Sequence, residues 1–531
     1  MSKRLRQNLI TLTALTAFAS VPSQAGATEF SELGQGLDNI GNESAVDLSG
    51  FLRLRGESLY NLDLDHGLTP SGLPLYPVPL GDPTGQRLDH SDARFRTDIS
   101  LYAPFGQVRV NSRIDVVDNL TLGSTPRGIP STTTSQDPPR ERVFRIKRVW
   151  GEALTPFGVI AAGRMGNTWG LGMLSNGGDC LQCDSGDAAD RIAFVTSRFN
   201  HFVAVAYDIG WVGPTATRKV ETREIDLGRS DNLHTVNLAL LRQRDALALD
   251  RRNRAGKVTF DYGAVFSHRW QRDDIPATYV PTTEPVEIND AQVIERNFSA
   301  QAYDVWLRLV GPNFRIEGEV AMLRARINET SVLPGTRFDV PSLSTQFGAA
   351  LETDFGPYDG RFKAGVDLGV ASGDSAYGFG ASPSLEQTPG QPGDLEGSQA
   401  NPPYDNSVNN FRFHPDYRID QILFREIIGT VTDAFYLRPH VSWDAWKATA
   451  GVLRFDFATV ASRAIYSSST PGGAEPLGIE LDPSVTYLSR DKFGLSLDYA
   501  VLFPLAGLDN VAQGISAKPA QSLRLQLTYG F

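Results

Sequence analysis

The sequence predicts an all-β protein, a transmembrane antiparallel β-barrel of about 18 strands with long extracellular loops and short periplasmic turns. Three observations predict it. Apolar and polar residues alternate in many short segments, the connections between these segments are alternately long and short, and the last segment ends on an aromatic residue. Mean hydropathy is -0.22 and no apolar run of about 20 residues follows the N-terminus, which excludes a membrane protein built of helices.

The first 27 residues have the pattern of a secretory signal peptide. They begin with three basic residues: Lys3, Arg4 and Arg6. Residues 9–21 are apolar or small, and residues 25–27 offer a cleavage site of small residues. We expect residues 1–27 to be removed and residues 28–44 to form a periplasmic N-terminal segment; the short apolar stretch disfavours an uncleaved anchor helix. Loss of the three basic residues takes the formal net charge from -11 to -14, which argues against nucleic acid as a partner.

Alternation with a period of two indicates strands in residues 45–531. In residues 108–116 the even positions are mostly apolar, and the odd positions carry arginine, asparagine or aspartate. The same pattern recurs in residues 314–322 and 361–370. A soluble sandwich with half-buried strands has this pattern too, so the layout of the connections must separate the two folds.

The connections between the predicted strands are alternately short and long, as in a membrane barrel. We expect strands near residues 45–60, 92–103, 107–118, 143–154, 159–170, 191–198, 201–211, 235–245, 257–271, 298–310, 314–327, 342–354, 360–373, 434–443, 447–457, 477–489, 492–503 and 521–531. Tight turns such as 104–106, 155–158 and 199–200 separate long polar connections, which include 61–91, 119–142, 171–190, 272–297, 374–433, 458–476 and 504–520. Short turns on one side and long loops on the other are typical of membrane barrels and not of sandwiches.

Lipid on the outside requires a closed sheet. An edge strand would expose unpaired N–H and C=O groups to hydrocarbon, so the strands must form a complete ring with an even count and both termini periplasmic. A barrel of about 18 strands is too wide for side chains to fill, which predicts an aqueous channel inside it.

The final segment places leucines and aromatic residues on one face and polar residues on the other. It resembles the terminal strand of bacterial outer-membrane barrels, whose closing phenylalanine is part of the assembly signal. The resemblance implies that Tyr529 and Phe531 form this signal, that the barrel assembly machinery is a partner, and that the protein lies in the bacterial outer membrane. Most tryptophans fall near segment ends, where an amphipathic ring suits the headgroup layer, although ordinary core packing explains any one of them equally well.

The polar faces of the first five predicted strands are rich in cations. The candidate pore-lining residues are Arg53, Arg55, Arg94, Arg96, Arg109, Arg113, Arg145, Lys147 and Arg164. A cationic wall favours anions. Acidic residues on the same strands allow the alternative of a solvated wall that pairs its own charges: Glu57, Asp98, Asp115 and Glu152. The sequence leaves the two readings open.

One long connection carries both cysteines of the chain, Cys180 and Cys183. One such pair does not complete a zinc site and no histidine lies nearby in the sequence, so in an oxidising compartment we expect a local disulfide. The aspartates around it do not have the spacing of a calcium loop, which favours a solvated acidic loop without a metal. The loop that narrows the channel is either this one, at 171–190, or the one at 212–234.

The sequence shows no motif of a hydrolase, a metalloprotease or a phosphate-binding loop, so we expect neither an enzyme nor a cofactor. The histidines are dispersed. His440 with Asp444, or His268 with Asp261, are conceivable acid–base pairs, but each is more simply a polar wall or interface residue.

Several stretches resemble large outer-membrane barrels of the porin and alginate-export type. They are residues 155–158, 163–164, 169–170, 186–191, 371–374, 411–417 and 478–482. The resemblance covers most of the mature chain, and some of its barrels have no assigned substrate. It implies passive passage of ions, small solutes or anionic polysaccharide, with Arg94, Arg96 and Arg164 as candidates for the constriction. The apolar residues 419–428 resemble a short helix or plug.

We therefore expect an outer-membrane channel for small or polymeric solutes with a modest preference for anions, in contact with outer-membrane lipid. A non-conducting barrel that serves as a surface adhesin or structural protein is the first alternative. A barrel hydrolase is the second.

Overall fold

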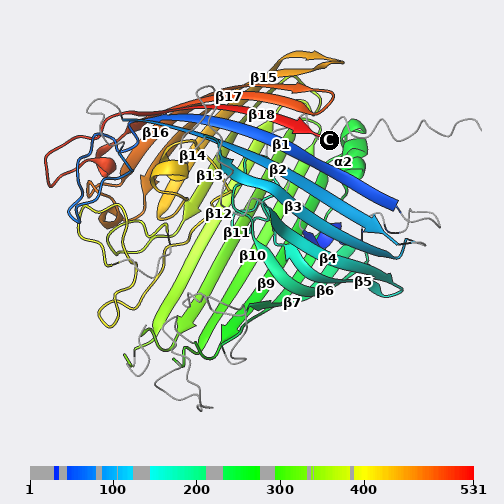
Figure 1. The fold of residues 1–531 in the computed structure, drawn as a ribbon, viewed down its shortest axis with the longest axis horizontal. Helices are drawn as coiled ribbons and strands as arrows, with labels where there is room; N and C mark the ends of the chain where they lie inside the picture. The colour runs from blue at the N-terminus through cyan, green and yellow to red at the C-terminus, as the bar shows by residue number, and fades with distance from the viewer. Residues whose placement is uncertain are drawn as a thin grey trace, which may run out of the picture.

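The computed structural model describes residues 29–34, 37, 45–78, 86–103, 106–123, 144–210, 231–274, 294–331, 337–338, 340–382 and 388–531. The predicted signal peptide lies outside these residues. Within them, one antiparallel sheet of 18 strands closes on itself, because β1 pairs with β2 on one side and with β18 on the other. Figure 1 shows β18 (red) beside β1 (blue), where the ring closes. The predicted fold class is confirmed.

The strands follow the sequence order around the ring. They are β1 (Ala45–Tyr60), β2 (Arg87–Tyr102), β3 (Val108–Thr121), β4 (Arg145–Thr155), β5 (Gly158–Gly166), β6 (Ala188–Arg198), β7 (His201–Gly210), β8 (Leu233–Arg242), β9 (Thr259–Gln271), β10 (Phe298–Gly311), β11 (Phe314–Ile327), β12 (Ser342–Phe355), β13 (Phe362–Ala371), β14 (Ala434–Ala448), β15 (Gly451–Ala464), β16 (Pro476–Ser489), β17 (Phe493–Pro504) and β18 (Ala520–Gly530). The short helices are α1 (Glu29–Glu32), α2 (Ala246–Arg254), the π-helical turn η2 (Leu423–Ile427), η3 (Ser467–Ser469) and η4 (Ala506–Leu508).

The outer face of the barrel is apolar because side chains alternate across each strand. On β18, Leu523 and Leu525 are 45% and 47% exposed, whereas the alternating residues Arg524 and Gln526 are 2% and 6% exposed. Leucines that face outward all along a strand belong in lipid and not in water. No helix in the described ranges has the length and apolar character needed to cross a membrane.

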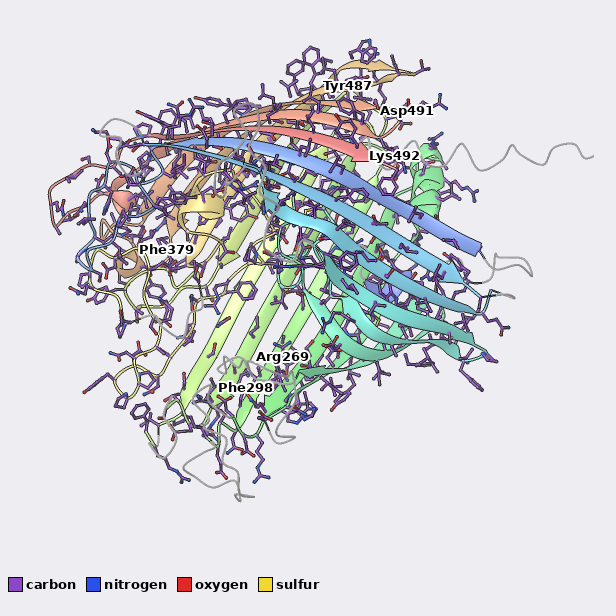
Figure 2. All side chains as sticks on the ribbon, in the orientation of Figure 1. Arg269, Phe298, Phe379, Tyr487, Asp491 and Lys492 are labelled. Atoms are coloured by element: carbon purple, nitrogen blue, oxygen red, sulfur yellow. A yellow bond between two sulfur atoms is a disulfide. The ribbon has the colours of Figure 1, made fainter. Side chains whose placement is uncertain are left out.

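The last strand closes the ring at the short-turn end, which we call the periplasmic end; the opposite end is the extracellular end. The backbone of Phe531 exchanges two hydrogen bonds with that of Gly50, of 3.3 and 3.0 Å. Its ring packs against that of Phe95 with centroids 5.9 Å apart. Lys492, in the turn before β17, donates its Nζ to the Phe531 carbonyl oxygen at 3.3 Å (Figure 2). These contacts place the terminal aromatic residue at the seam between β18 and β1.

The N-terminal segment reaches into the barrel. Phe30 of α1 is buried with Ala161, Leu241 and Trp306, which face inward. The Gly34 N–H donates to the Glu152 carboxylate on β4 at 2.7 Å. Residues 29–34 of the segment predicted to be periplasmic therefore pack against the inner wall.

Candidate constriction formed by two interior segments

Two long connections fold into the barrel instead of standing outside it. The first, residues 167–187 between β5 and β6, is called the crossing loop here. The second, residues 410–433 before β14, is called the inner segment. The sequence predicts an open aqueous interior because side chains alone cannot fill so wide a ring. The structure fills part of it with these two stretches of backbone.

The crossing loop is held on opposite sides of the ring. On one side, Glu319 of β11 accepts the backbone N–H groups of Leu171 at 2.5 Å and Leu174 at 3.2 Å. On the other side, Asp184 binds Arg53 of β1. β1 and β11 are ten positions apart in a ring of 18 strands, so they face each other across the interior. The loop therefore spans the barrel.

Arg53 and Arg55 clamp one end of the crossing loop. Arg53 Nη2 lies 3.0 Å from an oxygen of Asp92 and 3.0 Å from one of Asp184. Arg55 contacts the same two carboxylates at 2.7 and 2.9 Å. The side chains of Arg53 and Asp92 are fully buried. Such charges are stable in the interior because each has ionic partners and hydrogen bonds.

The neighbouring arginines on β2 hold the backbone of the same loop. Arg94 donates to the Cys183 carbonyl oxygen and lies 3.2 Å from Asp118. Arg96 binds Asp115 at 2.8 Å and donates to the Gly178 carbonyl oxygen at 2.7 Å. The four predicted pore-lining arginines of β1 and β2 are thus buried and engaged with the loop. Their positive charge is balanced locally and is not presented to solvent.

The next arginines are also paired. Arg109 binds Glu152 at 2.8 Å, and Arg113 binds Asp98 at 2.6 Å and also contacts Asp179 of the loop. These contacts favour the self-paired wall over the anion-attracting strip that the sequence left open.

Arg148 is a loop contact that the sequence did not predict. It donates to the Gly177 carbonyl oxygen and lies 3.3 Å from Asp179. The strict alternation predicts that Lys147 faces inward in its place. A register shift between β3 and β4 next to Arg113 reverses which residues of β4 face inward, so that Arg148 points into the barrel. The alternation of the sequence does not reveal this shift.

Three predicted pore-lining residues lie at the extracellular mouth. Lys147 and Arg145 bind Asp118 at 2.6 and 3.3 Å. Arg164 shares the outward phase of its strand, is 53% exposed and binds Asp190 at 2.8 Å. No hydrogen bond or ion pair joins Arg164 to the described crossing loop, so it is not part of the candidate constriction. The polarity of Arg164 suggested an inward position, but near a strand end the outer face meets headgroups and water as well.

Cys180 and Cys183 form a disulfide at the tip of the crossing loop, with Cα atoms 5.1 Å apart. Around it, the aspartates are not free in solvent as expected, because they have partners inside the barrel, while Asp179 and Asp187 keep 40% and 44% of their side-chain surface exposed. Asp179 and Asp184 bind arginines, and Asp187 lies 3.5 Å from His414. No cluster of potential metal ligands occurs among the residues that the structure describes.

The inner segment locks onto the crossing loop. Asp416 accepts the backbone N–H of Asp184 at 2.8 Å, and Arg418 binds the Asp184 side chain at 2.8 Å. The His414 N–H donates to the Met173 carbonyl oxygen at 2.7 Å. The two segments therefore form one partition within the barrel.

A single carboxylate fixes the inner segment to the wall. Glu480 of β16 accepts the N–H groups of Gln421, Ile422 and Leu423 at 2.8, 2.9 and 3.0 Å. These are the backbone donors at the start of η2, which a helix leaves unsatisfied without a capping group. The turn itself is buried in an apolar cluster whose side chains include Phe379, Phe411, Phe413, Leu423, Phe424 and Ile427. The apolar stretch 419–428 is therefore a packed interior element.

The pKa values of the loop carboxylates reflect these contacts. Burial alone would raise the pKa of Asp184, but Arg418, Arg55 and Arg53 hold it well below its usual value of 3.8. Arg113 and Arg148 likewise overcome burial and lower the pKa of Asp179 to about 2. Both carboxylates therefore stay ionised in moderate acid.

The conceivable acid–base pairs are not formed. His440 lies 3.3 Å from Asp367, while Asp444 binds Arg454 at 2.7 Å. His268 lies on the outward phase of β9, whereas Asp261 on the same strand is buried inside. His440 therefore pairs with Asp367 and not with Asp444, and His268 and Asp261 lie on opposite faces of β9.

An inward arginine near the mouth differs from those above. Arg269 of β9 is exposed and donates to the Thr235 hydroxyl at 3.1 Å, and no ion pair joins it to a carboxylate within the described part of the chain. Arg269 (labelled in Figure 2) lines an open cavity of about 820 Å³ together with Arg145, Lys147, Arg164, Asp190 and Asp208. Sequence alternation places Arg269 inward, but nothing in the sequence separates it from the paired arginines.

No family model and no curated protein matches this sequence. Among solved structures, the chain is similar to a BenF-like porin from Pseudomonas fluorescens Pf-5, at 11% identity over 91% of this chain and 98% of that chain, with a TM-score of 0.44. It is similar to Pseudomonas aeruginosa OccK11 (OpdR), at 9% identity over 93% and 97% of the two chains, with a TM-score of 0.44. It is also similar to Pseudomonas aeruginosa OpdK crystallised with vanillate, at 9% identity over 91% and 98%, with a TM-score of 0.42.

Proposed function

We propose that this protein is a channel of the bacterial outer membrane through which small solutes diffuse passively. The observation that carries the proposal is the partition anchored on opposite walls of a closed, lipid-facing barrel. A barrel that served only as an anchor or adhesin would not need buried ion pairs to hold two segments across its interior. Because the crossing loop divides the lumen, small solutes fit the proposal better than polymers do.

Planar-bilayer recording tests the channel. Purified, folded protein is expected to insert and give discrete conductance steps, because the outer face is apolar and a ring of 18 strands is too wide for side chains alone to fill. Heat-shifted gel mobility shows that the barrel is folded. Folded protein that inserts and gives no steps would instead favour the adhesin or structural alternative.

The chemistry proposed here includes no catalytic step and no cofactor. A barrel hydrolase would need turnover of a substrate that is lost on replacement of one histidine. The proposal also includes assembly by the barrel assembly machinery, with Tyr529 and Phe531 as the terminal signal. Phe531 lies at the seam that closes the ring, which supports this part.

Anion preference is assigned to the mouth and not to the buried arginines. Arg269 faces a cavity at the mouth and has no ion pair with a described carboxylate, whereas Arg145 and Lys147 bind Asp118 and the positive charges of β1 and β2 are neutralised. Replacing Arg269 by glutamine is expected to lower the anion-to-cation permeability ratio by about twofold or more. Reversal potentials in a salt gradient measure this ratio. Arg87→Gln, which changes an exposed arginine, is the matched control; an equal change in both variants would refute the assignment.

The Asp184 anchor of the crossing loop is expected to persist in moderate acid. The pKa of Asp184 is lowered in the folded protein, so its stabilising contribution is complete above 3.8 and is lost only as the pH falls through the much lower folded value. Loss of the Asp184 anchor is therefore not expected to raise the channel conductance between about pH 7 and about pH 4. Asp184→Asn is expected to raise conductance at both values. A wild-type conductance that rises steeply below about pH 5, with no such rise in Asp184→Asn, would contradict this anchor.

A further inference from the structure

The outer face of β11 changes from apolar to cationic near the extracellular end. Its outward side chains, from the periplasmic end, are Phe314, Ile316, Gly318, Val320, Met322, Arg324 and Arg326. About ten residues separate Phe314 from Arg324, and a rise of about 3.3 Å per residue at a tilt of about 40° gives roughly 25 Å. That is the height of the apolar band of a membrane barrel. Arg324 and Arg326 therefore lie at the level of the lipid headgroups.

The adjoining strands extend this cationic level into a patch. Arg324 is opposite Gln301 of β10, which is opposite His268 of β9. His268 stacks with Trp270 at a ring-centroid distance of 5.3 Å, and Trp270 lies 5.4 Å from His234 of β8. We call this set the outer-rim patch: His234, His268, Trp270, Gln301, Arg324 and Arg326. It combines cations, hydrogen-bond donors and an amphipathic ring on one face.

The two arginines of the patch are not neutralised by the protein. Arg326 donates to the Asn328 side chain at 2.7 Å, and no ion pair joins either arginine to a carboxylate in the ranges that the structure describes. Other outward arginines near extracellular strand ends each have a carboxylate partner: Arg87 with Asp89, Arg164 with Asp190 and Arg463 with Glu475. Unpaired charge at the headgroup level is thus a local property of β11.

We propose that the outer-rim patch binds the phosphate group of an anionic membrane lipid. Arg324 and Arg326 point the same way from one strand, about 7 Å apart, which suits two guanidinium groups that share one phosphate. Guanidinium forks match phosphate oxygens geometrically, and the histidines and Trp270 supply further polar and aromatic contacts to a headgroup. A lipid acyl chain then lies on the apolar residues below. This binding goes beyond the channel proposal and does not depend on conduction.

Native mass spectrometry of the detergent-folded full barrel tests the patch. The probes are dilauroyl phosphatidic acid and dilauroyl phosphatidylcholine, which share acyl chains and differ in net charge. Wild-type protein is expected to retain phosphatidic acid preferentially. Arg324→Gln/Arg326→Gln is expected to weaken that retention by roughly tenfold. The control Arg87→Gln/Arg463→Gln, which removes two outward arginines with carboxylate partners, is expected to retain it.

Three results would overturn the proposal. The first is equal retention of the two lipids by the wild type, and the second is an equal loss of retention in the two double variants. The third is displacement of phosphatidic acid by inorganic phosphate at equal concentration, which would indicate a site for free phosphate. Should the double variant fail to fold by gel mobility, the single variants Arg324→Gln and Arg326→Gln carry the test, each with an expected loss of about threefold.

Discussion

Replacing Arg53 by alanine is expected to destabilise the folded barrel by about 3–5 kcal/mol and to widen the channel. The reason is that the ion pair of Arg53 with Asp92, called the clamp here, is completely buried: neither side chain has exposed surface. The Arg53 guanidinium also binds Asp184. Its removal leaves buried negative charge with Arg55 as the remaining partner from β1. Denaturant unfolding of the detergent-folded protein measures the stability, and single-channel recording measures the conductance.

The control for this prediction is an arginine–carboxylate pair of the same chemistry on the outside. Arg87 and Asp89 lie 3.0 Å apart and are 65% and 61% exposed. Arg87→Ala is expected to cost at most about 1 kcal/mol because solvent screens such a pair. Similar losses in Arg53→Ala and Arg87→Ala would contradict the clamp. A destabilised Arg53→Ala with unchanged conductance would show that the clamp supports the fold without setting the channel width.

The barrel could be predicted from the sequence because its cause is local. Lipid outside and polar groups inside impose a period of two on every strand, and that period is readable over a few residues. The first strand was predicted at residues 45–60 and is observed as β1 with the same bounds. The second begins at Arg87 and not near residue 92, because its first outward residues are polar where the strand leaves the apolar band.

The partition could not be predicted because its contacts are distant in sequence. In the sequence, Glu319 and Glu480 do not differ from the other inward carboxylates. In the structure, Glu319 accepts the backbone N–H of Leu171, 148 residues away, and Glu480 accepts that of Leu423, 57 residues away. The arginines of β1 and β2 were predicted as a charged wall from their phase alone. The alternation along a strand shows which way a side chain points but not which distant residues pack against it. The burial of these arginines by residues 167–187 is therefore visible only in the tertiary structure.

Replacing Glu480 by leucine is expected to release the inner segment from the wall. The variant removes the acceptor of three backbone N–H groups at the start of η2. A buried donor left without a partner costs about 1–3 kcal/mol, so roughly 3 kcal/mol or more of local stability is lost. Because the segment also holds Asp184 through Arg418, the crossing loop is expected to loosen and the conductance to rise.

Trypsin reports this release directly, since two of the three arginines of the inner segment, Arg418 and Arg425, flank the residues that Glu480 holds. The side chains of Arg418 and Arg425 are 17% and 9% exposed, so wild-type protein is expected to resist cleavage there. Glu480→Leu is expected to be cut at both sites while the barrel stays closed by gel mobility. Glu475→Leu, which removes a 44%-exposed carboxylate near the same strand, is the control and is expected to resist. Protection that survives in Glu480→Leu would show that the apolar cluster around η2 holds the segment without its carboxylate cap.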